Sequence, residues 1–190
     1  MIIYTRKKEI QFAQTSSEIE GELSESAWQD HLDAWDFLKE TDTVSLHDLL
    51  ECHYGLQIRL RPDIAGKFRT CNVRVGSHIM PHYASVVAMT RAWLRKWTGS
   101  KLPKTEEECR TAHIEFENIH PFEDGNGRVG RCILNWHRRK LNLPILIIHV
   151  GEEQQAYYGW FKEAQNSDAL YKTLGSDCVR SYTKKFTKKR

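Results

Sequence analysis

The chain has 190 residues, of which 40% are hydrophobic and 28% are charged, so its composition excludes the apolar-poor, one-signed chains that remain disordered. The length predicts one domain with at most a short appendage. The 28 basic and 25 acidic residues leave a formal charge of only +3, which does not favour nucleic acid as a partner.

Apolar residues at a spacing of three to four predict a mainly α-helical chain. The first half of the sequence carries three such stripes, over residues 24–39, 46–54 and 81–97. Thr105 and Glu108 form a capping-box pattern, which predicts a helix that begins there and buries Cys109, Ala112, His113 and Phe116. Helical spacing resumes from Val129 to Lys140, stops before Pro144, and is predicted again from Glu152 onward.

Two segments are predicted to be extended instead of helical. Residues 68–76, FRTCNVRVG, alternate in polarity and end at a glycine, which predicts a small exposed hairpin or flap. Residues 145–150, ILIIHV, are β-branched, but so short an apolar run also fits a buried helix entry or a loop.

The cysteines and the hydropathy pattern predict a compartment. The five cysteines are odd in number and contain no C-x-x-C pair, which argues against a disulfide framework or a zinc site and for a reducing environment. No stretch approaches 18 apolar residues, and charge appears within six residues of the N-terminus. We therefore expect a cytoplasmic protein with no membrane partner.

The segment that carries chemistry is HPFEDGNGRVGR, residues 120–131. Gly125, Asn126 and Gly127 stand just before a predicted helix, where exposed N–H groups and the helix N-terminus form an anion cradle. Arg128 and Arg131 lie three residues apart and share a helix face, so both can point at a polyphosphate.

Two further side chains of this segment suit a phosphate reaction. Asp124 is a carboxylate beside the cradle, where Mg²⁺ would take one protein oxygen and complete its shell with phosphate and water. His120 has a pKa suited to accept a proton from a hydroxyl at neutral pH. Each residue alone fits an ordinary turn, but together they supply a base, a metal ligand, an anion cradle and two cations within twelve residues.

This segment resembles the full Fic motif, HPFx[D/E]GNGRxxR, at every specified position. The resemblance implies a Fic fold, a helical bundle with a small β-hairpin flap, with ATP as donor and Mg²⁺ or Mn²⁺ as cofactor. It implies that His120 is the general base and that Asp124 binds the metal. It further implies that Gly125 to Gly127 cradle the phosphates, Asn126 contacts the α-phosphate, and Arg128 and Arg131 contact the terminal phosphates.

The resemblance extends beyond the motif. The segment from Gly66 to Gly76 resembles the region leading into the Fic flap, where residues 68–80 would dock a target protein by strand addition. Ser16, Glu20 and Gly21 match the inhibitory pattern [S/T]xxxE[G/N] of the N-terminally inhibited Fic class. A carboxylate at Glu20 would pair with Arg131 and occupy the space of the γ-phosphate. A capping box with Ser17 as N-cap and Glu20 three residues later fits the same letters without any function.

These patterns predict three parts: residues 1–44, a helical segment with the inhibitory motif; residues 45–167, the Fic core; and residues 168–190, a C-terminal helix and basic tail. The tail is expected to be solvated, with an arm for nucleic acid or an acidic partner as the alternative.

The expected function is transfer of AMP from ATP to a Ser, Thr or Tyr hydroxyl of a target protein, autoinhibited by the N-terminal helix. Doc-like phosphotransfer, transfer of another nucleotide, removal of AMP and a non-catalytic nucleotide- or nucleic-acid-binding regulator remain alternatives. The sequence fixes neither the target nor the oligomeric state.

Overall fold

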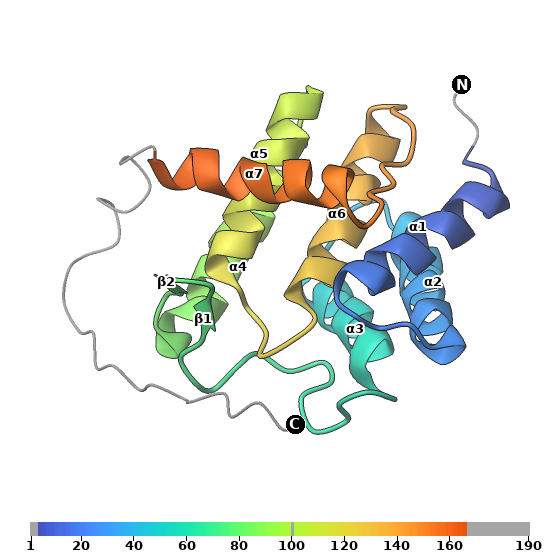
Figure 1. Ribbon diagram of the computed structural model, residues 1–190. Helices are drawn as coiled ribbons and strands as arrows, with labels where there is room; N and C mark the ends of the chain where they lie inside the picture. The colour runs from blue at the N-terminus through green and yellow to red at the C-terminus, as the bar shows by residue number, and fades with distance from the viewer. Residues whose placement is uncertain (1–3, 100, 167–190) are drawn as a thin grey trace.

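The computed structural model describes residues 4–99 and 101–166 (Figure 1). Within these ranges the chain is mainly α-helical, as the apolar spacing predicts. The elements follow the order α1 (Arg6–Ile19), α2 (Glu25–Lys39), α3 (Leu46–Gln57), β1 (Arg74–Val75), β2 (His78–Ile79), α4 (Tyr83–Trp97), α5 (Glu106–Ile119), α6 (Asn126–Lys140) and α7 (Glu152–Asn166). Cys178 and the predicted C-terminal part, 168–190, lie outside the described residues.

Helix α6 is the centre of the bundle. Twelve of its 15 residues are buried, so the helix contacts other parts of the protein on nearly every face. It packs against α1, α2, α3 and α5, while α7 runs across α5. In Figure 1, α6 lies between the hairpin on one side and the α1–α2 pair on the other. The core is filled by large side chains from several helices and from the loop between α5 and α6, among them Phe12, Trp35, Leu49, Phe116, Phe122, Ile133 and Trp136.

Polar side chains begin the helices where the sequence pattern predicts them. The hydroxyls of Ser24, Ser45 and Thr105 each accept a hydrogen bond from the backbone N–H three residues later. Only half of the capping box predicted at Thr105 forms, because the Glu108 carboxylate accepts from the N–H of Lys104, with N and O 2.6 Å apart.

The extended segments are shorter than their sequence indicates. Only Arg74 and Val75 pair with His78 and Ile79, in an antiparallel hairpin whose turn contains Gly76 at φ 57°. Residues 68–73 form no strand because this stretch binds the motif loop instead, beginning with the Arg69 N–H on the Pro121 carbonyl, 3.0 Å apart.

Residues 145–150 are irregular, so the buried-strand interpretation of this run is wrong. The side-chain amide of Asn135 makes the hydrogen bonds to Leu146 that a neighbouring strand would otherwise make. It accepts from the Leu146 N–H at 2.7 Å and donates to the Leu146 carbonyl at 3.0 Å.

Helix α1 ends at the inhibitory pattern and does not begin there. Thr5 caps its first turn, and Ser16 and Ser17 lie in its last turn, with Glu20 as the C-cap residue. The capping-box interpretation of these letters is therefore wrong. Gly21 then reverses the chain at φ 80°, a conformation that favours glycine.

Within the described ranges, no helix combines the length and the apolar character that crossing a membrane requires. The cytoplasmic location stays a prediction from the cysteine pattern.

Candidate active site

The motif loop joins α5 to α6 through two left-handed residues. His120 closes α5 at φ 50° and ψ 64°, and its N–H still bonds to the Phe116 carbonyl. Gly125 caps α6 at φ 80°, and a Cβ there would collide with the side-chain amide of Gln57. A larger residue at position 125 is therefore excluded by conformation and by space.

The Asn126 side chain holds the loop closed. Its Oδ1 accepts from the Phe122 N–H at 2.8 Å, and its Nδ2 donates to the Phe122 carbonyl at 2.9 Å. The side chain is buried, and both of its polar atoms are used inside the protein. Closing the loop is thus a structural task of Asn126, and the α-phosphate contact that the family resemblance implies stays a prediction.

Phe122 anchors this loop from the inside. Its fully buried ring stacks on His53 with centroids 3.8 Å apart, and on Phe68 with centroids 5.9 Å apart. Nδ1 of His53 accepts from the Gly66 N–H at 3.1 Å, so Nε2 carries the proton and donates to the Asp124 carbonyl at 3.0 Å. Burial lowers the pKa of His53 to about 4, which keeps this bridge neutral.

Arg69 fastens the segment before the hairpin to the motif loop. Its buried guanidinium donates only to backbone carbonyls, and burial lowers its pKa. The acceptors are the carbonyls of His120 at 2.7 Å, Cys71 at 2.9 Å, Pro81 at 2.5 Å and Ile119 at 3.4 Å. The loop position of His120 therefore depends on a residue 51 positions earlier.

The His120 ring is arranged to accept a proton. Its Nδ1 lies 3.3 Å from the Glu117 carbonyl oxygen, an acceptor that favours the tautomer with hydrogen on Nδ1. Nε2 then carries the free lone pair. Burial lowers the pKa of His120 to about 4, so the ring is neutral at pH 7 and available as a base.

The start of α6 contains the buried cationic side chain expected of an anion site. Arg128 is 1% exposed, and its Nε and Nη1 have no hydrogen-bond partner in the protein. Its Nη2 lies 3.1 Å from the Gln57 amide oxygen, in the orientation that also lets this oxygen accept from the Gly125 N–H at 3.2 Å. Unpaired donors of a buried guanidinium fit a phosphate ligand.

Asp124 provides the carboxylate beside this cradle. Its side chain is half exposed, with Oδ1 accepting from the Gly125 N–H at 2.7 Å and Oδ2 lying 3.9 Å from Nη2 of Arg128. The described residues contain no cluster of three or more His, Cys, Asp or Glu that could hold a metal alone. The donor set therefore fits Mg²⁺ bound by one carboxylate together with phosphate oxygens.

The end of α1 lies directly against the motif. Arg131 donates from Nε to the Ser16 hydroxyl at 2.7 Å, and from Nη2 to the Ser16 carbonyl at 2.9 Å and to Oε1 of Glu20 at 2.7 Å. A Cβ on Gly127 would collide with the Glu20 carboxylate. The structure therefore brings Ser16 and Glu20 to Arg131 and Gly127, and Gly21 follows them as the residue at which the chain turns.

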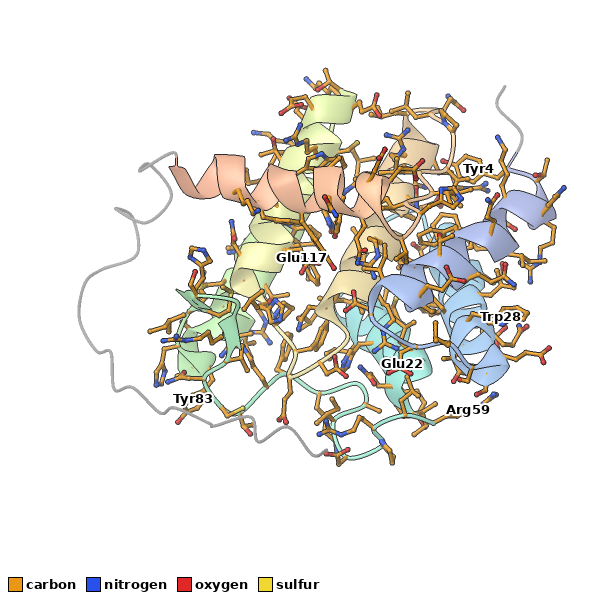
Figure 2. All side chains as sticks on the ribbon, viewed as in Figure 1. Tyr4, Glu22, Trp28, Arg59, Tyr83 and Glu117 are labelled. Atoms are coloured by element: carbon orange, nitrogen blue, oxygen red, sulfur yellow. The ribbon has the colours of Figure 1, made fainter. Side chains whose placement is uncertain are left out.

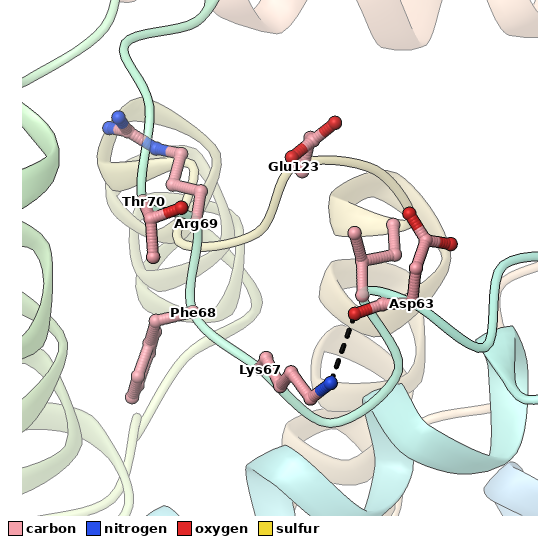
Figure 3. A pocket seen from close by; sticks show the side chains of 7 residues that line it. Asp63, Lys67, Phe68, Arg69, Thr70 and Glu123 are labelled. Carbon is pink, nitrogen blue, oxygen red and sulfur yellow. Dashed lines mark hydrogen bonds between the residues drawn. The ribbon is translucent and has the colours of Figure 1, made fainter.

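A small pocket lies between residues 63–70 and the motif loop (Figure 3). Phe68, Arg69, Thr70 and Glu123 line it, and Lys67 donates across it to the Asp63 carbonyl at 3.0 Å. Its volume of about 120 Å³ is too small for a nucleotide.

Sequence reasoning missed four residues that support the site: His53, Gln57, Arg69 and Glu117. His53 and Gln57 lie on a helix that the sequence predicts, but neither residue type nor spacing indicates their partners, because these partners are about 70 residues away. Glu117 stands on the predicted helix before His120, where a charged residue three positions from a base is the only signal.

Comparisons with known proteins agree with this geometry. The model of the Fic/DOC family matches residues 37–137. A protein adenylyltransferase Fic from Culex quinquefasciatus is 32% identical over 134 residues, which are 69% of this chain and 26% of that protein. One from Nematostella vectensis is 27% identical over the same length and is covered to 31%. The chain thus spans about a quarter to a third of the length of these relatives.

Solved structures share the fold. A variant of Fic-1 from C. elegans superposes with a TM-score of 0.69 at 25% identity, over 86% of this chain and 57% of that one. A Fic domain containing signaling protein from Bacteroides thetaiotaomicron gives a TM-score of 0.72 at 18% identity, over 91% and 77%, and supports the fold alone. With the helical bundle, the hairpin and the intact motif, the chain belongs to the Fic/DOC family.

Proposed function

We propose that this chain transfers AMP from ATP to a Ser, Thr or Tyr hydroxyl of another protein. The observation that carries the proposal is the position of His120 at the end of α5, with Nδ1 at the Glu117 carbonyl, beside a glycine-lined cradle with the buried, partly unpaired guanidinium of Arg128. The names of the relatives, protein adenylyltransferase Fic, support the same chemistry.

In the proposed reaction, the hydroxyl oxygen of the target attacks the α-phosphorus of ATP. The hydroxyl proton moves to Nε2 of His120, the new oxygen–phosphorus bond forms, and the bond from the α-phosphorus to the bridging oxygen breaks to release pyrophosphate. Arg128 and the N–H groups at the start of α6 stabilise charge on the phosphates. Positioning and charge stabilisation account for most of the rate in such reactions.

Asp124 would hold Mg²⁺ or Mn²⁺ in this site. When bound, the metal supplies positive charge against the departing pyrophosphate. We expect transfer to stop in excess EDTA and to be lost in Asp124→Ala. Undiminished transfer by either preparation would contradict the metal assignment.

The target is proposed to dock along the hairpin, residues 68–80. Its strands are two residues long, and Val75 and Ile79 are 44% and 48% exposed, so a strand edge and apolar side chains are accessible to an extended segment.

Autoinhibition by α1 is the second part of the proposal. A carboxylate over Gly127 that also pairs with Arg131 stands where the γ-phosphate is expected to bind. ATP would then bind misaligned, so that nucleotide binding and transfer become separable.

One labelling experiment separates the alternative functions. The Glu20→Gly chain is incubated with cell lysate and with ATP labelled at either the α or the γ position. We expect label on protein from the α position only. Label from the γ position only would indicate Doc-like phosphotransfer, and label from neither position would favour a non-catalytic regulator. Labelled UTP and GTP test other nucleotides, and pre-labelled target tests removal of AMP.

A matched pair of variants tests the inhibition. We expect Glu20→Gly to transfer AMP at least about tenfold faster than the unmodified chain, since about 1.4 kcal/mol of blocking free energy suffices for that ratio. Glu18→Gly places the same glycine two residues earlier, at another exposed glutamate that does not pair with Arg131, and should stay as slow as the unmodified chain. Equal rates for Glu20→Gly and Glu18→Gly would reject the inhibitory role.

A further inference from the structure

Glu117 is an acidic side chain enclosed beside the proposed base. It lies one helical turn before His120 on α5, in the middle of the bundle in Figure 2. Its side chain is only 13% exposed, and Oε1 is buried with no hydrogen-bond partner. A Cβ on Gly130 of α6 would collide with Oε1, so the carboxyl fits between the two helices only because residue 130 is glycine.

Two oxygens of Glu117 face the same nitrogen of His120. The backbone carbonyl oxygen is 3.3 Å from Nδ1, and Oε2 of the carboxyl is 3.8 Å from it. The carbonyl fixes the hydrogen on Nδ1 and leaves Nε2 to accept a proton. The carboxyl oxygen is then the nearest acidic group to the positive charge that the ring acquires.

We propose that Glu117 is a positioning residue for His120, whose carboxylate orients the ring and offsets its charge once the ring has taken the hydroxyl proton. This proposal rests on the proposed function of His120 as the base. The arrangement places an acidic group behind a histidine that accepts the proton of a hydroxyl nucleophile, as in hydrolases with a histidine–carboxylate pair.

The ionisation of Glu117 depends on the groups around it. Burial raises the pKa of Glu117 to about 8, the Arg131 guanidinium on α6 lowers it, and the Glu20 carboxylate at the end of α1 raises it. His113 faces the same glycine from α5. Arg69 lowers the pKa of His120, and Glu20 and Asp124 raise it. The carboxyl is thus mostly protonated at neutral pH while Glu20 is in place.

The ionisation of Glu117 gives the rate of AMP transfer a defined pH dependence. The charge of His120 is offset only when Glu117 is ionised, so transfer should increase as the pH rises through the pKa of Glu117. In Glu20→Gly, a carboxylate that raises this pKa is absent, so the increase should occur below pH 8. Displacement of Glu20 would then clear the phosphate site and also let Glu117 ionise at a lower pH.

The kinetic test uses the Glu20→Gly chain as the background. Glu117→Gln keeps the shape of the side chain but cannot ionise. We expect kcat to fall about tenfold with the KM for ATP unchanged, because general-base catalysis as a whole is worth roughly 10²–10⁴-fold. The pH-dependent increase should disappear in Glu117→Gln and persist in Glu117→Asp. Glu107→Gln, the same change at an exposed position of α5, should alter neither.

A second measurement does not depend on activity. In NMR spectra of the unmodified chain, the His120 ring signals, assigned with His120→Ala, should shift through an inflection near pH 8, as Glu117 ionises. The inflection should be absent in Glu117→Gln and present in Glu107→Gln. Its absence from the unmodified chain, or its persistence in Glu117→Gln, would overturn the pairing. If the inflection appears but no variant transfers AMP, the pairing stands and the proposed function fails.

Discussion

The two sides of the motif loop are held in different ways. On one side, Asn126 of α6, His53 of α3 and Arg69 before the hairpin form hydrogen bonds with backbone groups of the loop, so they form part of its structure. On the α1 side, Ser16 and Glu20 contact the motif through the side chain of Arg131. The difference indicates that the loop can keep its shape when the end of α1 moves away.

The comparison continues along α1 itself. Near its start, the buried Glu9 carboxylate accepts from Nε1 of Trp35 at 3.2 Å and from Nζ of Lys39 at 3.0 Å. Buried, paired charges of this kind are costly to separate. We infer that release of Arg131 involves the last turn of α1 and the glycine after it, while the first turns stay on α2.

The largest effect is expected inside the loop. In the Glu20→Gly background, His120→Ala should lower transfer by at least about 100-fold, because the hydroxyl loses its base. Binding of ATP, measured by calorimetry, should change less than about twofold, because the ring serves the proton and not the phosphates. His47→Ala removes an exposed histidine of α3 and should leave both quantities unchanged. If the double variant transfers AMP as fast as Glu20→Gly alone, His120 is not the base.

We expect acid to destabilise the folded chain at a pH above the range in which ordinary carboxylates become fully protonated. Burial lowers the pKa values of five histidines in the folded chain: to about 3 for His113, to about 4 for His53, His120 and His137, and well below the ordinary value for His31. Below about pH 6.5 these rings are protonated in the unfolded chain but stay neutral in the folded chain, so protons stabilise the unfolded chain. Their contribution is therefore present above pH 6.5 and is lost as the pH falls toward 4.

We expect the thermal unfolding temperature to fall by about 10 °C or more between pH 7 and pH 5. Circular dichroism and tryptophan fluorescence should report the same transition, because the buried rings are distributed over α2, α3, α5 and α6. A constant unfolding temperature over this range would show that the rings accept protons without unfolding.

Asn126→Ala distinguishes a residue of the loop from a residue of the phosphate site. The change leaves the N–H and the carbonyl of Phe122 buried without partners, which should lower the free energy of unfolding by about 2–4 kcal/mol in urea. Asn118→Ala, on α5, should cost less than about 0.5 kcal/mol. If Asn126 served only the α-phosphate, its loss would slow transfer and leave stability unchanged.

The sequence predicts those parts of the molecule whose structure depends on residues close together in the sequence. Helical spacing and N-cap residues predict most of the helices, and Pro121 and the glycines of residues 120–131 predict a loop between two of them. The pairing of Glu20 with Arg131 is also expected from the sequence, but only through the resemblance to the Fic family. The alternative, a capping box at the start of a helix, is wrong because SSEIEG lies at the end of α1, and nothing in these six residues distinguishes the two positions.

The rest depends on long-range contacts that no local pattern records. His53 reaches a carbonyl 71 residues later, and Arg69 reaches carbonyls about 50 residues later. The sequence does not indicate that Asn126 closes the loop on Phe122, and its contact with the α-phosphate stays a prediction. These residues become identifiable only when the buried polar groups of the folded loop are matched with their partners.

The smallest effect is expected at Ser16, on the α1 side. Ser16→Ala removes the hydroxyl that accepts from Nε of Arg131, but Nη2 keeps the Ser16 carbonyl and the Glu20 carboxylate. We expect transfer to increase about fivefold, less than in Glu20→Gly, in keeping with about 1 kcal/mol for one hydrogen bond. Ser17→Ala is the matched control, because this buried hydroxyl contacts His31 at 3.3 Å, away from the motif. If the two serine variants gain equally, general loosening of α1 explains the increase. If Ser16→Ala adds nothing in the Glu20→Gly background, the two residues act through Arg131 as one lock on the site.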